Sequence, residues 1–384
     1  MHSGKRALAV ALRARARINL AAIERNAGRL HAGLSPGAEL CAVVKANASS
    51  HGAVPVARAA LAGGATRLAV ATALEAVELR DAGVTAPVLV MGALSAQELP
   101  IALAARADVV AWTPEFVTDL QRAAGRVGVH VKYDTGMGRL GMRELDAALA
   151  VADQVLAAGA PLVLAGAMTH FATADGERAF MDFQLQAFAP FVAAMRARAP
   201  EITVHAANSA GTLRDPAAHF DMVRCGIALY GCDPMNEDPD RHGLEPALEL
   251  SSYVAAVKLA RRGQSAGYGR RFVAGGDTWI ATVPIGYGDG IRRALAGRLD
   301  VLIAGRRRPV VGTISMDNLT VALGPARPPD IGAGTTVTLV GRDGSERQTV
   351  EDLARGMDSI HHEVLCGLSP RVTREYHRDG EPAG

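Results

Sequence analysis

Short apolar runs alternate with longer segments of helical spacing up to about residue 245. Each run is nearly continuous in apolar residues, which is typical of parallel strands covered by helices on both sides. There are eight such runs, at residues 40–45, 67–71, 87–91, 107–112, 128–134, 161–170, 202–208 and 222–230. Eight strand–helix units in succession predict an α/β fold, a (β/α)8 TIM barrel.

A doubly wound open sheet is the competing fold. It predicts a glycine-rich G-x-G-x-x-G turn after the first strand. Residues 45–52 read KANASSHG instead, so the sequence favours the barrel.

The pattern changes after residue 245. Short β-branched segments separated by glycine-rich turns follow, at residues 254–257, 279–284, 300–303, 309–315 and 335–340, and a helical pattern returns only at residues 349–355. This predicts a C-terminal, mainly antiparallel β domain. We expect the barrel over residues 14–245, the β domain over residues 246–378, and tails at residues 1–13 and 379–384.

Composition and charge narrow the class of protein. Apolar residues make up 49% of the chain and charged residues 21%, as in ordinary globular proteins. The formal net charge is only +2, so strong attraction to nucleic acid or to an anionic membrane is not expected. The N-terminal apolar run is short and followed by arginines, which makes a poor signal peptide, and no continuous apolar helix could span a membrane.

The cysteines carry little functional signal. Cys41, Cys225, Cys232 and Cys366 form no C-x-x-C pair and have no zinc-ligand spacing. Reduced thiols in a cytoplasmic protein are the favoured interpretation.

Functional groups of a barrel gather where its strands end. The first predicted strand ends in Lys45, one of only four lysines among 41 basic residues. Burial beside an apolar strand lowers the pKa of an amine, and a neutral amine is what imine chemistry requires. The alternative is a lysine that extends to the barrel rim. Other polar strand ends are Lys132, His170, Asn208, Ser209 and Arg224.

The last two strands suggest a phosphate site. Asn208 and Ser209 follow the seventh run, and Gly226 and Ile227 lie within the eighth, where barrels often hold phosphate on backbone amides. A helix N-cap serine at Ser209 and a turn glycine would explain these residues equally well. An imine-forming lysine with a phosphate cradle suggests pyridoxal 5′-phosphate (PLP). A sugar-phosphate aldolase would have the same two features, and the residues alone do not separate them.

Eight segments along the chain resemble one family in order. They are AVVKANASSHG (42–52), VKYDTGMGRLG (131–141), THFATAD (169–175), HAANSAG (205–211), VRCGIALYG (223–231), AGYGRRF (266–272), PIGYGDG (284–290) and VGTISMDNLTV (311–321). The chain resembles the alanine racemases, PLP enzymes of fold type III, from about residue 18 to residue 376. The resemblance implies a cytoplasmic homodimer that interconverts L- and D-alanine.

The family's catalytic roles carry over to residues of both predicted domains. Lys45 would hold PLP and act as one base. Tyr268 of the partner subunit would be the base on the opposite face, because racemisation needs a base on each side of a planar intermediate. Arg224 would face the pyridine nitrogen, His170 would pack against the ring, and Arg139 would contact the ring hydroxyl and the substrate carboxylate.

The remaining roles concern binding. Lys132 would be carbamylated and orient Arg139. Phosphate would be bound by Ser49, Asn208, Ser209, Gly226, Ile227 and His362. The partner's β domain would line the amino-acid site with Tyr287, Met316 and Asp317.

Three positions depart from the family pattern. Ser49 and His362 stand where the family has tyrosines that contact the PLP phosphate, and Cys225 replaces a proline. Losing a hydrogen bond to a charged group costs about 1.5–3 kcal/mol. We therefore expect weaker PLP retention than in a typical member, and a gate that admits a larger or more polar amino acid.

Other functions remain open from the sequence. One alternative is a fold-type III enzyme with changed chemistry, such as a racemase of a larger amino acid, or a lyase or aldolase acting on a β-hydroxy amino acid. Another is a protein that only carries PLP, which the β domain with Tyr268 and Tyr287 disfavours. Adjacent His361 and His362, followed by Glu363, invite a metal interpretation, but such neighbours rarely converge on one ion. We expect no metal.

Overall fold

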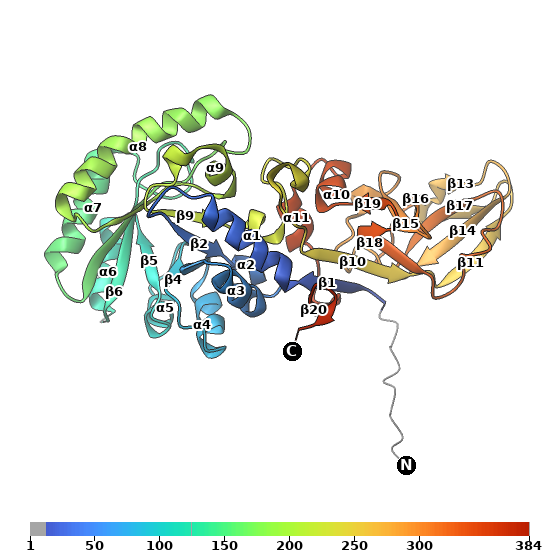
Figure 1. Ribbon diagram of the computed structural model, residues 1–384, viewed down its shortest axis with the longest axis horizontal. Helices are drawn as coiled ribbons and strands as arrows, with labels where there is room; N and C mark the ends of the chain where they lie inside the picture. Colours follow the sequence, from blue (N-terminus) through green and yellow to red (C-terminus); the bar gives the residue numbers. More distant parts are fainter. Residues whose placement is uncertain (1–12, 124, 384) are drawn as a thin grey trace, which may run out of the picture. The chain divides into compact units, whose positions relative to one another are not determined.

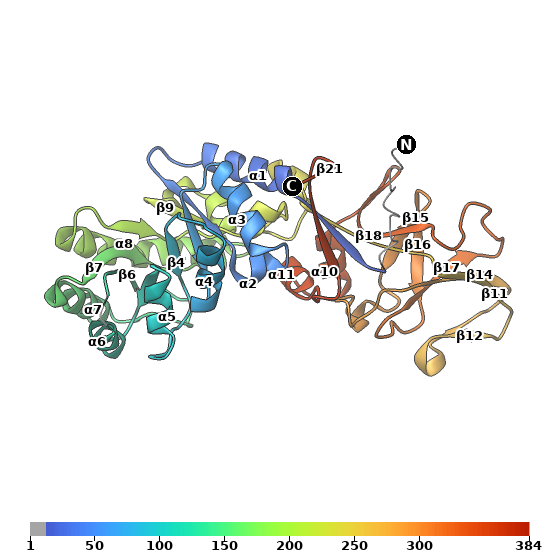
Figure 2. The same ribbon diagram turned by 90° about the horizontal axis from the view of Figure 1, so that it is seen from below.

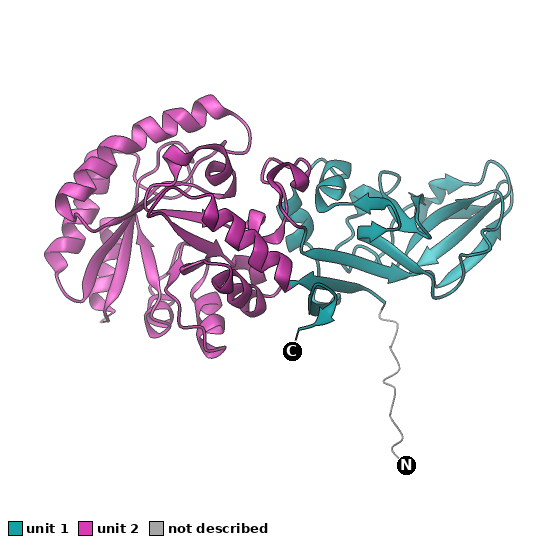
Figure 3. Ribbon diagram, viewed as in Figure 1, with its two compact units in different colours: residues 1–19, 246–384 teal, residues 20–245 magenta. Residues whose placement is uncertain are grey.

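The computed structural model describes residues 13–123 and 125–383. The chain divides into two compact units (Figure 3). Unit 2 comprises Leu20–Glu245, and unit 1 joins the segment ending at Asn19 to the chain from Pro246 onward. No described helix is both long and apolar enough to cross a membrane.

Unit 2 contains eight parallel strands in the order β8-β7-β6-β5-β4-β3-β2-β9 (Figure 1). They are β2 (Glu39–Val43), β3 (Arg67–Val70), β4 (Val88–Val90), β5 (Asp108–Ala111), β6 (Val127–Lys132), β7 (Leu162–Met168), β8 (Thr203–His205) and β9 (Met222–Cys225). Backbone bonds from Asp221 N to Val204 O (3.0 Å) and from Arg224 N to Ala207 O (2.9 Å) join the two ends. The predicted barrel is therefore confirmed.

Helices follow the barrel strands and cover them. They are α1 (Leu20–Ala32), α2 (Lys45–Ser49), α3 (Ala53–Ala62), α4 (Ala73–Asp81), α5 (Leu99–Ala104), α6 (Pro114–Arg122), α7 (Leu145–Ala158), α8 (Arg178–Arg198) and α9 (Ser209–Arg214). Several begin where the sequence supplies a cap. Thr72 and Glu75 form a reciprocal capping box at α4, and Thr113 caps α6.

The eighth apolar run differs from its prediction. Only Met222–Cys225 is a strand, and a 3₁₀ helix, η2 (Ile227–Tyr230), follows. Gly226 separates the two elements and packs closely on β2, where an added Cβ would lie 3.4 Å from Val43 Cβ. The Tyr230 hydroxyl donates to Val43 O at 2.8 Å, which ties η2 to the end of β2.

Unit 1 is built on a mainly antiparallel sheet in the order β11-β14-β17-β16-β15-β18-β10-β1-β20-β21, with β19 paired to β18. The strands are β1 (Arg15–Asn19), β10 (Leu248–Tyr253), β11 (Ala256–Ala260), β14 (Thr278–Val283), β15 (Asp300–Ile303), β16 (Arg306–Val311), β17 (Leu319–Gly324), β18 (Thr336–Asp343), β19 (Glu346–Gln348), β20 (Thr373–Arg378) and β21 (Glu381–Pro382). Helices α10 (Val350–Gly356) and α11 (His361–Cys366) complete it.

The domain boundaries differ from the expected ones at the N-terminal side. Residues 14–19 were expected in the barrel, but β1 lies between β10 and β20 in the sheet of unit 1. Its alternating burial explains this, since Ala16 and Ile18 are fully buried in that sheet while Arg17 pairs with Glu249. The expected C-terminal tail contains β21, which forms a hairpin with β20. Most of the expected N-terminal tail lies outside the described residues.

Candidate active site

Lys45 begins an unusual turn at the carboxyl end of β2. The next five residues, 46–50, all have φ between +50° and +67°. This left-handed conformation is costly for residues with a Cβ, by about 1–2 kcal/mol each. The turn therefore persists only because its surroundings hold it.

The contacts of the turn supply that restraint. Glu75, the capping residue of α4, accepts a hydrogen bond from Ala46 N at 2.6 Å. Asn47 Oδ1 accepts from Ala53 N at 2.8 Å, which couples the turn to the start of α3. Ser49 is buried within it. Lys45 is exposed at this end of the barrel, so the expected burial of its amine is wrong and the alternative of a lysine at the barrel rim is correct.

Arg224, on β9, is buried and held on several sides. Its Nη1 donates to His205 Nδ1 at 2.8 Å, and its Nη2 donates to Thr169 O and Ala206 O at 2.9 Å. Nη2 also lies 3.2 Å from His170 Nδ1. Burial lowers the pKa of Arg224 to about 10, so the guanidinium stays charged at neutral pH.

Cations crowd this end of the barrel. Burial, reinforced by Arg224 and Arg139, lowers the pKa of Lys132 to about 8. Burial and Arg224 also lower the pKa of His170 well below its usual value, with Lys45 among the further contributors. A group of cations that depress one another's pKa values fits an anionic ligand.

Arg139 is exposed at the end of a shaped loop. Asp134 accepts hydrogen bonds from Gly136 N at 3.1 Å and Gly138 N at 3.0 Å, which fixes the backbone just before Arg139. Both glycines have positive φ, at 138° and 70°.

Four of the expected phosphate residues follow β8 and β9 in unit 2, namely Asn208, Ser209, Gly226 and Ile227. Ser209 Oγ accepts a hydrogen bond from Gly226 N at 3.0 Å, and Asn208 caps α9 through Gly211 N at 2.9 Å. Ser209 and Ile227 each open a short helix, and the N–H groups at such positions have no partner within their own helix. The expectation of a serine N-cap is therefore wrong, because the N-cap is Asn208 and Ser209 is the first residue of the helix. The N–H groups at the two helix starts suit an anion.

Unit 1 displays its candidate residues on loops. Tyr268 lies at the tip of the hairpin of β12 (Ser265–Ala266) and β13 (Phe272–Val273), which projects from the sheet of this unit in Figure 2. Its side chain is 72% exposed. Thr313 Oγ1 donates to Tyr268 O at 2.8 Å and anchors the tip.

Tyr287 and Met316 are on two loops that bond to each other. Tyr287 N donates to Ser315 O at 3.0 Å, and Gly288 N donates to Met316 O at 2.9 Å. Arg371 pairs with Asp317 on one loop and lies 3.5 Å from Asp289 on the other. His362 is exposed on α11.

Some residues at the site were missed from the sequence. Thr169 and His205 hold Arg224 although neither was selected. Both stand in motifs that were noticed, THFATAD and HAANSAG, but nothing in a single sequence marks which side chain of a motif faces inward. Among the described residues, no group of three or more His, Cys, Asp or Glu side chains could hold a metal ion.

The residues of unit 2 fit PLP. The fit rests on an accessible lysine, a charged guanidinium that is buried, and a group of cations that lower the pKa of Lys132. The chain is thus of the class that joins a TIM barrel, here with a lysine after its first strand, to an antiparallel β domain.

Comparisons with known proteins identify the family within that class. Residues 18–234 match the alanine racemase N-terminal domain and residues 247–376 the alanine racemase C-terminal domain. The chain is 39% identical to alanine racemase 1 of Bacillus subtilis over 95% of its own length and 93% of that protein. It is 41% identical to the alanine racemase of Mycolicibacterium smegmatis over 94% and 93% of the two chains.

Solved structures agree. The alanine racemase of Streptomyces lavendulae superposes with a TM-score of 0.90 at 37% identity, over 95% of this chain and 97% of that one. That of E. faecalis gives 0.88 at 36% identity, over 95% and 98%. The chain belongs to the alanine racemase family, an isomerase family, as the resemblance implied.

Proposed function

We propose that this chain interconverts L- and D-alanine with PLP bound at Lys45. The observation that carries the proposal is the exposed amine of Lys45 at the barrel end where Arg224, Lys132 and His170 gather. PLP, when bound, supplies an electron sink that stabilises the charge left after Cα loses its proton. The substrate is then a small amino acid, with its carboxylate at Arg139.

The residues of the barrel orient the ligands. Arg224 is a permanent donor, so it faces the ring nitrogen of the cofactor without giving up a proton. His170 packs beside it as a neutral ring, since its pKa is lowered. The phosphate is bound by Asn208, Ser209, Gly226, Ile227 and His362, and Ser49 reaches it only through a bridging water.

Two bases move the α-proton. Lys45 Nζ takes or returns it on one face, and the Tyr268 hydroxyl does so on the other. Tyr287 and Met316 enclose the substrate, with Asp317 supporting their loops. Tyr268, Tyr287 and Met316 are exposed on unit 1, which suits residues that a second copy's site receives in a homodimer.

Lys132 is carbamylated in the proposed enzyme. Only a neutral amine reacts with carbon dioxide, and a pKa of about 8 leaves a substantial neutral fraction near neutral pH. The carbamate carries a negative charge. The repulsion between Lys132 and Arg139 is thereby replaced by an attraction between them.

The decisive experiment follows the α-proton. L-Alanine is incubated with the enzyme and PLP in heavy water, and Cα exchange and optical inversion are recorded together. We expect both, at rates lost in Lys45→Ala. Inversion without solvent exchange, or turnover of L-alanine to a product other than D-alanine, would refute the proposal.

The shared site has its own test. Differently tagged Lys45→Ala and Tyr268→Phe chains are co-expressed and the mixed dimer is purified. One of its two sites then combines an intact Lys45 with an intact Tyr268, so about half of the wild-type activity is expected if the partner supplies Tyr268. An inactive mixed dimer would place both bases on one chain.

A cytoplasmic location completes the proposal. All four cysteines are free thiols, with Cys41, Cys225 and Cys232 buried, which suits a reducing compartment.

A further inference from the structure

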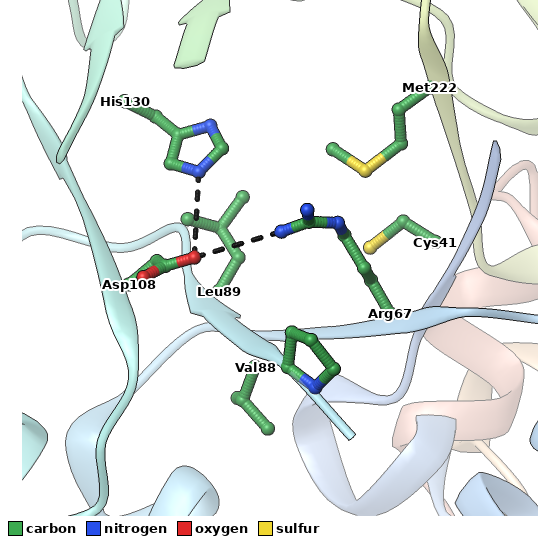
Figure 4. Close-up of a pocket in the computed structure, with 8 residues that line it drawn as sticks. Cys41, Arg67, Val88, Leu89, Asp108, His130 and Met222 are labelled. Atoms are coloured by element: carbon green, nitrogen blue, oxygen red, sulfur yellow. Dashed lines mark ion pairs between the residues drawn. The ribbon is translucent and has the colours of Figure 1, made fainter. Parts of the chain in front are cut away.

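A line of polar side chains runs through the barrel interior below Arg224. His205 presents Nδ1 to Arg224 Nη1 at 2.8 Å, and its Nε2 lies 2.8 Å from Nδ1 of His130 on β6. His130 Nε2 lies 3.8 Å from a carboxylate oxygen of Asp108 on β5. Figure 4 shows His130 and Asp108 facing each other in a pocket that Arg67, Cys41 and Met222 also line.

Hydrogen-bond chemistry fixes the direction of this line. A guanidinium has donors and no acceptor, so His205 Nδ1 accepts from Arg224 and the His205 proton is on Nε2. That proton is donated to His130 Nδ1. The His130 proton is then on Nε2, facing Asp108. Every donor points from Arg224 toward the carboxylate.

Both histidines are buried inside the barrel, and His205 is a neutral ring. Burial, followed by Arg224 and His130, lowers the pKa of His205 well below its usual value. A second proton on either ring would place two N–H groups face to face, because each ring already has one nitrogen that accepts a hydrogen bond. The line therefore has one proton arrangement in which no two N–H groups oppose each other.

Two glycines leave room for the lower half of the line. A Cβ added to Gly166 on β7 would lie 1.8 Å from His130 Nδ1. A Cβ added to Gly128 on β6 would lie 2.3 Å from Asp108 Oδ1, the oxygen that accepts a hydrogen bond from Gly128 N at 3.1 Å. Any side chain at these positions would displace the imidazole or the carboxylate.

Asp108 is kept ionised by its neighbours. Burial raises the pKa of Asp108, but His130, Arg67 and Gly128 N–H outweigh it, so the pKa lies below its usual value. Arg67 lies 3.8 Å from the same carboxylate oxygen that faces His130, and it also pairs with Glu39 at 3.0 Å. Among the described residues, no carboxylate forms an ion pair with Arg224 itself.

We propose that Asp108 and His130 are positioning residues for Arg224, and that the Asp108 carboxylate supports, at the far end of the line, the direction that Arg224 imposes on it. The inference rests on the proposed function, in which Arg224 faces the ring nitrogen of PLP. Because His205 is held as an acceptor, Arg224 Nη1 keeps its hydrogen bond to His205 Nδ1 and the guanidinium stays in place. The carboxylate that balances the charge of Arg224 is Asp108, which is separated from it by the two imidazole rings.

The variant Asp108→Asn tests the direction with little change of shape. Oδ1 remains committed to Gly128 N–H, so the new amide presents an N–H group to His130. His130 is then driven to accept at Nε2 and to carry its proton on Nδ1, where it opposes the Nε2 proton of His205. The variant thus replaces the acceptor that faces His130 Nε2 with a donor, while the side chain at position 108 keeps its volume.

The first readout is the tautomer of each ring. Long-range ¹H–¹⁵N spectra of ¹⁵N-histidine-labelled full-length protein, with and without PLP, report which nitrogen carries the proton. We expect His130 and His205 to be Nε2–H in the wild type, and a Nδ1–H or mixed signal for His130 in Asp108→Asn. His130→Gln assigns the His130 signal by its loss.

The second readout is kinetic and uses the PLP-loaded enzyme. We expect kcat to fall about tenfold in Asp108→Asn with KM changed less than about twofold, because the substrate contacts are untouched. If Asp108 acts through His130, then Asp108→Asn should cost less than about twofold when added to His130→Gln. Asp221→Asn is the matched control, because Asp221 also binds strand backbone, at Val204 N, but contacts neither histidine.

Several results would overturn the inference. Unchanged tautomers in Asp108→Asn would do so even if kcat fell, because the effect would then be structural only. Additive losses in the double variant, or an equal loss in Asp221→Asn, would do so as well. Absence of racemisation in the wild type would instead refute the proposed function. The spectra of the PLP-free protein would still show the tautomers of His130 and His205, so the two failures can be told apart.

Discussion

Replacing alanine by glycine normally destabilises a helix, but in the left-handed turn after Lys45 we expect the same replacement to stabilise the protein. Ala46 is exposed, has φ 53° and ψ 48°, and bonds to Glu75 only through its backbone N–H. Ala46→Gly therefore removes the clash of a Cβ without removing a contact. Relief of about 1–2 kcal/mol, less about 0.4–1 kcal/mol for the greater freedom of the unfolded chain, leaves a net gain of about 0.5–1 kcal/mol.

A matched substitution lies on α7. Ala150 is also exposed but sits inside a right-handed helix, where Ala→Gly costs about 1 kcal/mol. The two variants should therefore differ by roughly 1.5–2 kcal/mol in opposite directions from the wild type.

The assay is urea unfolding of the PLP-free protein, with the barrel transition followed by circular dichroism. The free energies of unfolding are compared among variants that have the same dependence on urea concentration (the same m-value). Removing PLP keeps ligand binding from shifting the midpoint. If Ala46→Gly lowered stability as much as Ala150→Gly does, the turn would not be strained and the reasoning would fail.

Three further predictions concern the site. In carbon-dioxide-free buffer the wild type should gain stability relative to Lys132→Met as pH rises from about 8 toward 10.5, because the unfolded chain binds the proton that folded Lys132 has lost; parallel urea curves at both pH values would contradict this. Ser49→Tyr should bind PLP about tenfold more tightly in a spectral titration, since a phosphate hydrogen bond is gained, and an unchanged Kd would remove Ser49 as the cause of weak retention. Arg371→Met should raise KM for alanine more than it lowers kcat by loosening the loops of Tyr287 and Met316, whereas a pure kcat effect would argue against loop positioning.

Much of the barrel is readable from the sequence because its strands are continuous apolar runs. The segment at residues 300–303 was also placed correctly as β15. The β unit was harder to predict, since the alternating burial of β10 and β17 interrupts any apolar run. The strand β1 could not be placed, because its partners come from the far end of the chain.

The candidate site divides in the same way. Lys45, Lys132, His170 and Arg224 could be selected because each lies on or just after a recognisable strand. His130 and Asp108 could not, since they lie inside and at the start of strands, where a polar residue resembles an isolated structural one. Their link to Arg224 is visible only once the barrel brings β5, β6, β8 and β9 round one interior.

The position of β1 has a consequence for biosynthesis. The ribosome releases this strand before the barrel sequence, yet β10 and β20, between which it lies, are made only after it. The barrel can fold before β1 has found its partner strands. The unit that bears Tyr268 therefore folds last, and it needs segments from both ends of the polypeptide. Expressing residues 246–384 alone would leave β20 and β21 detached from their sheet, and trimming the N-terminus through Asn19 would damage the far unit rather than the nearby barrel.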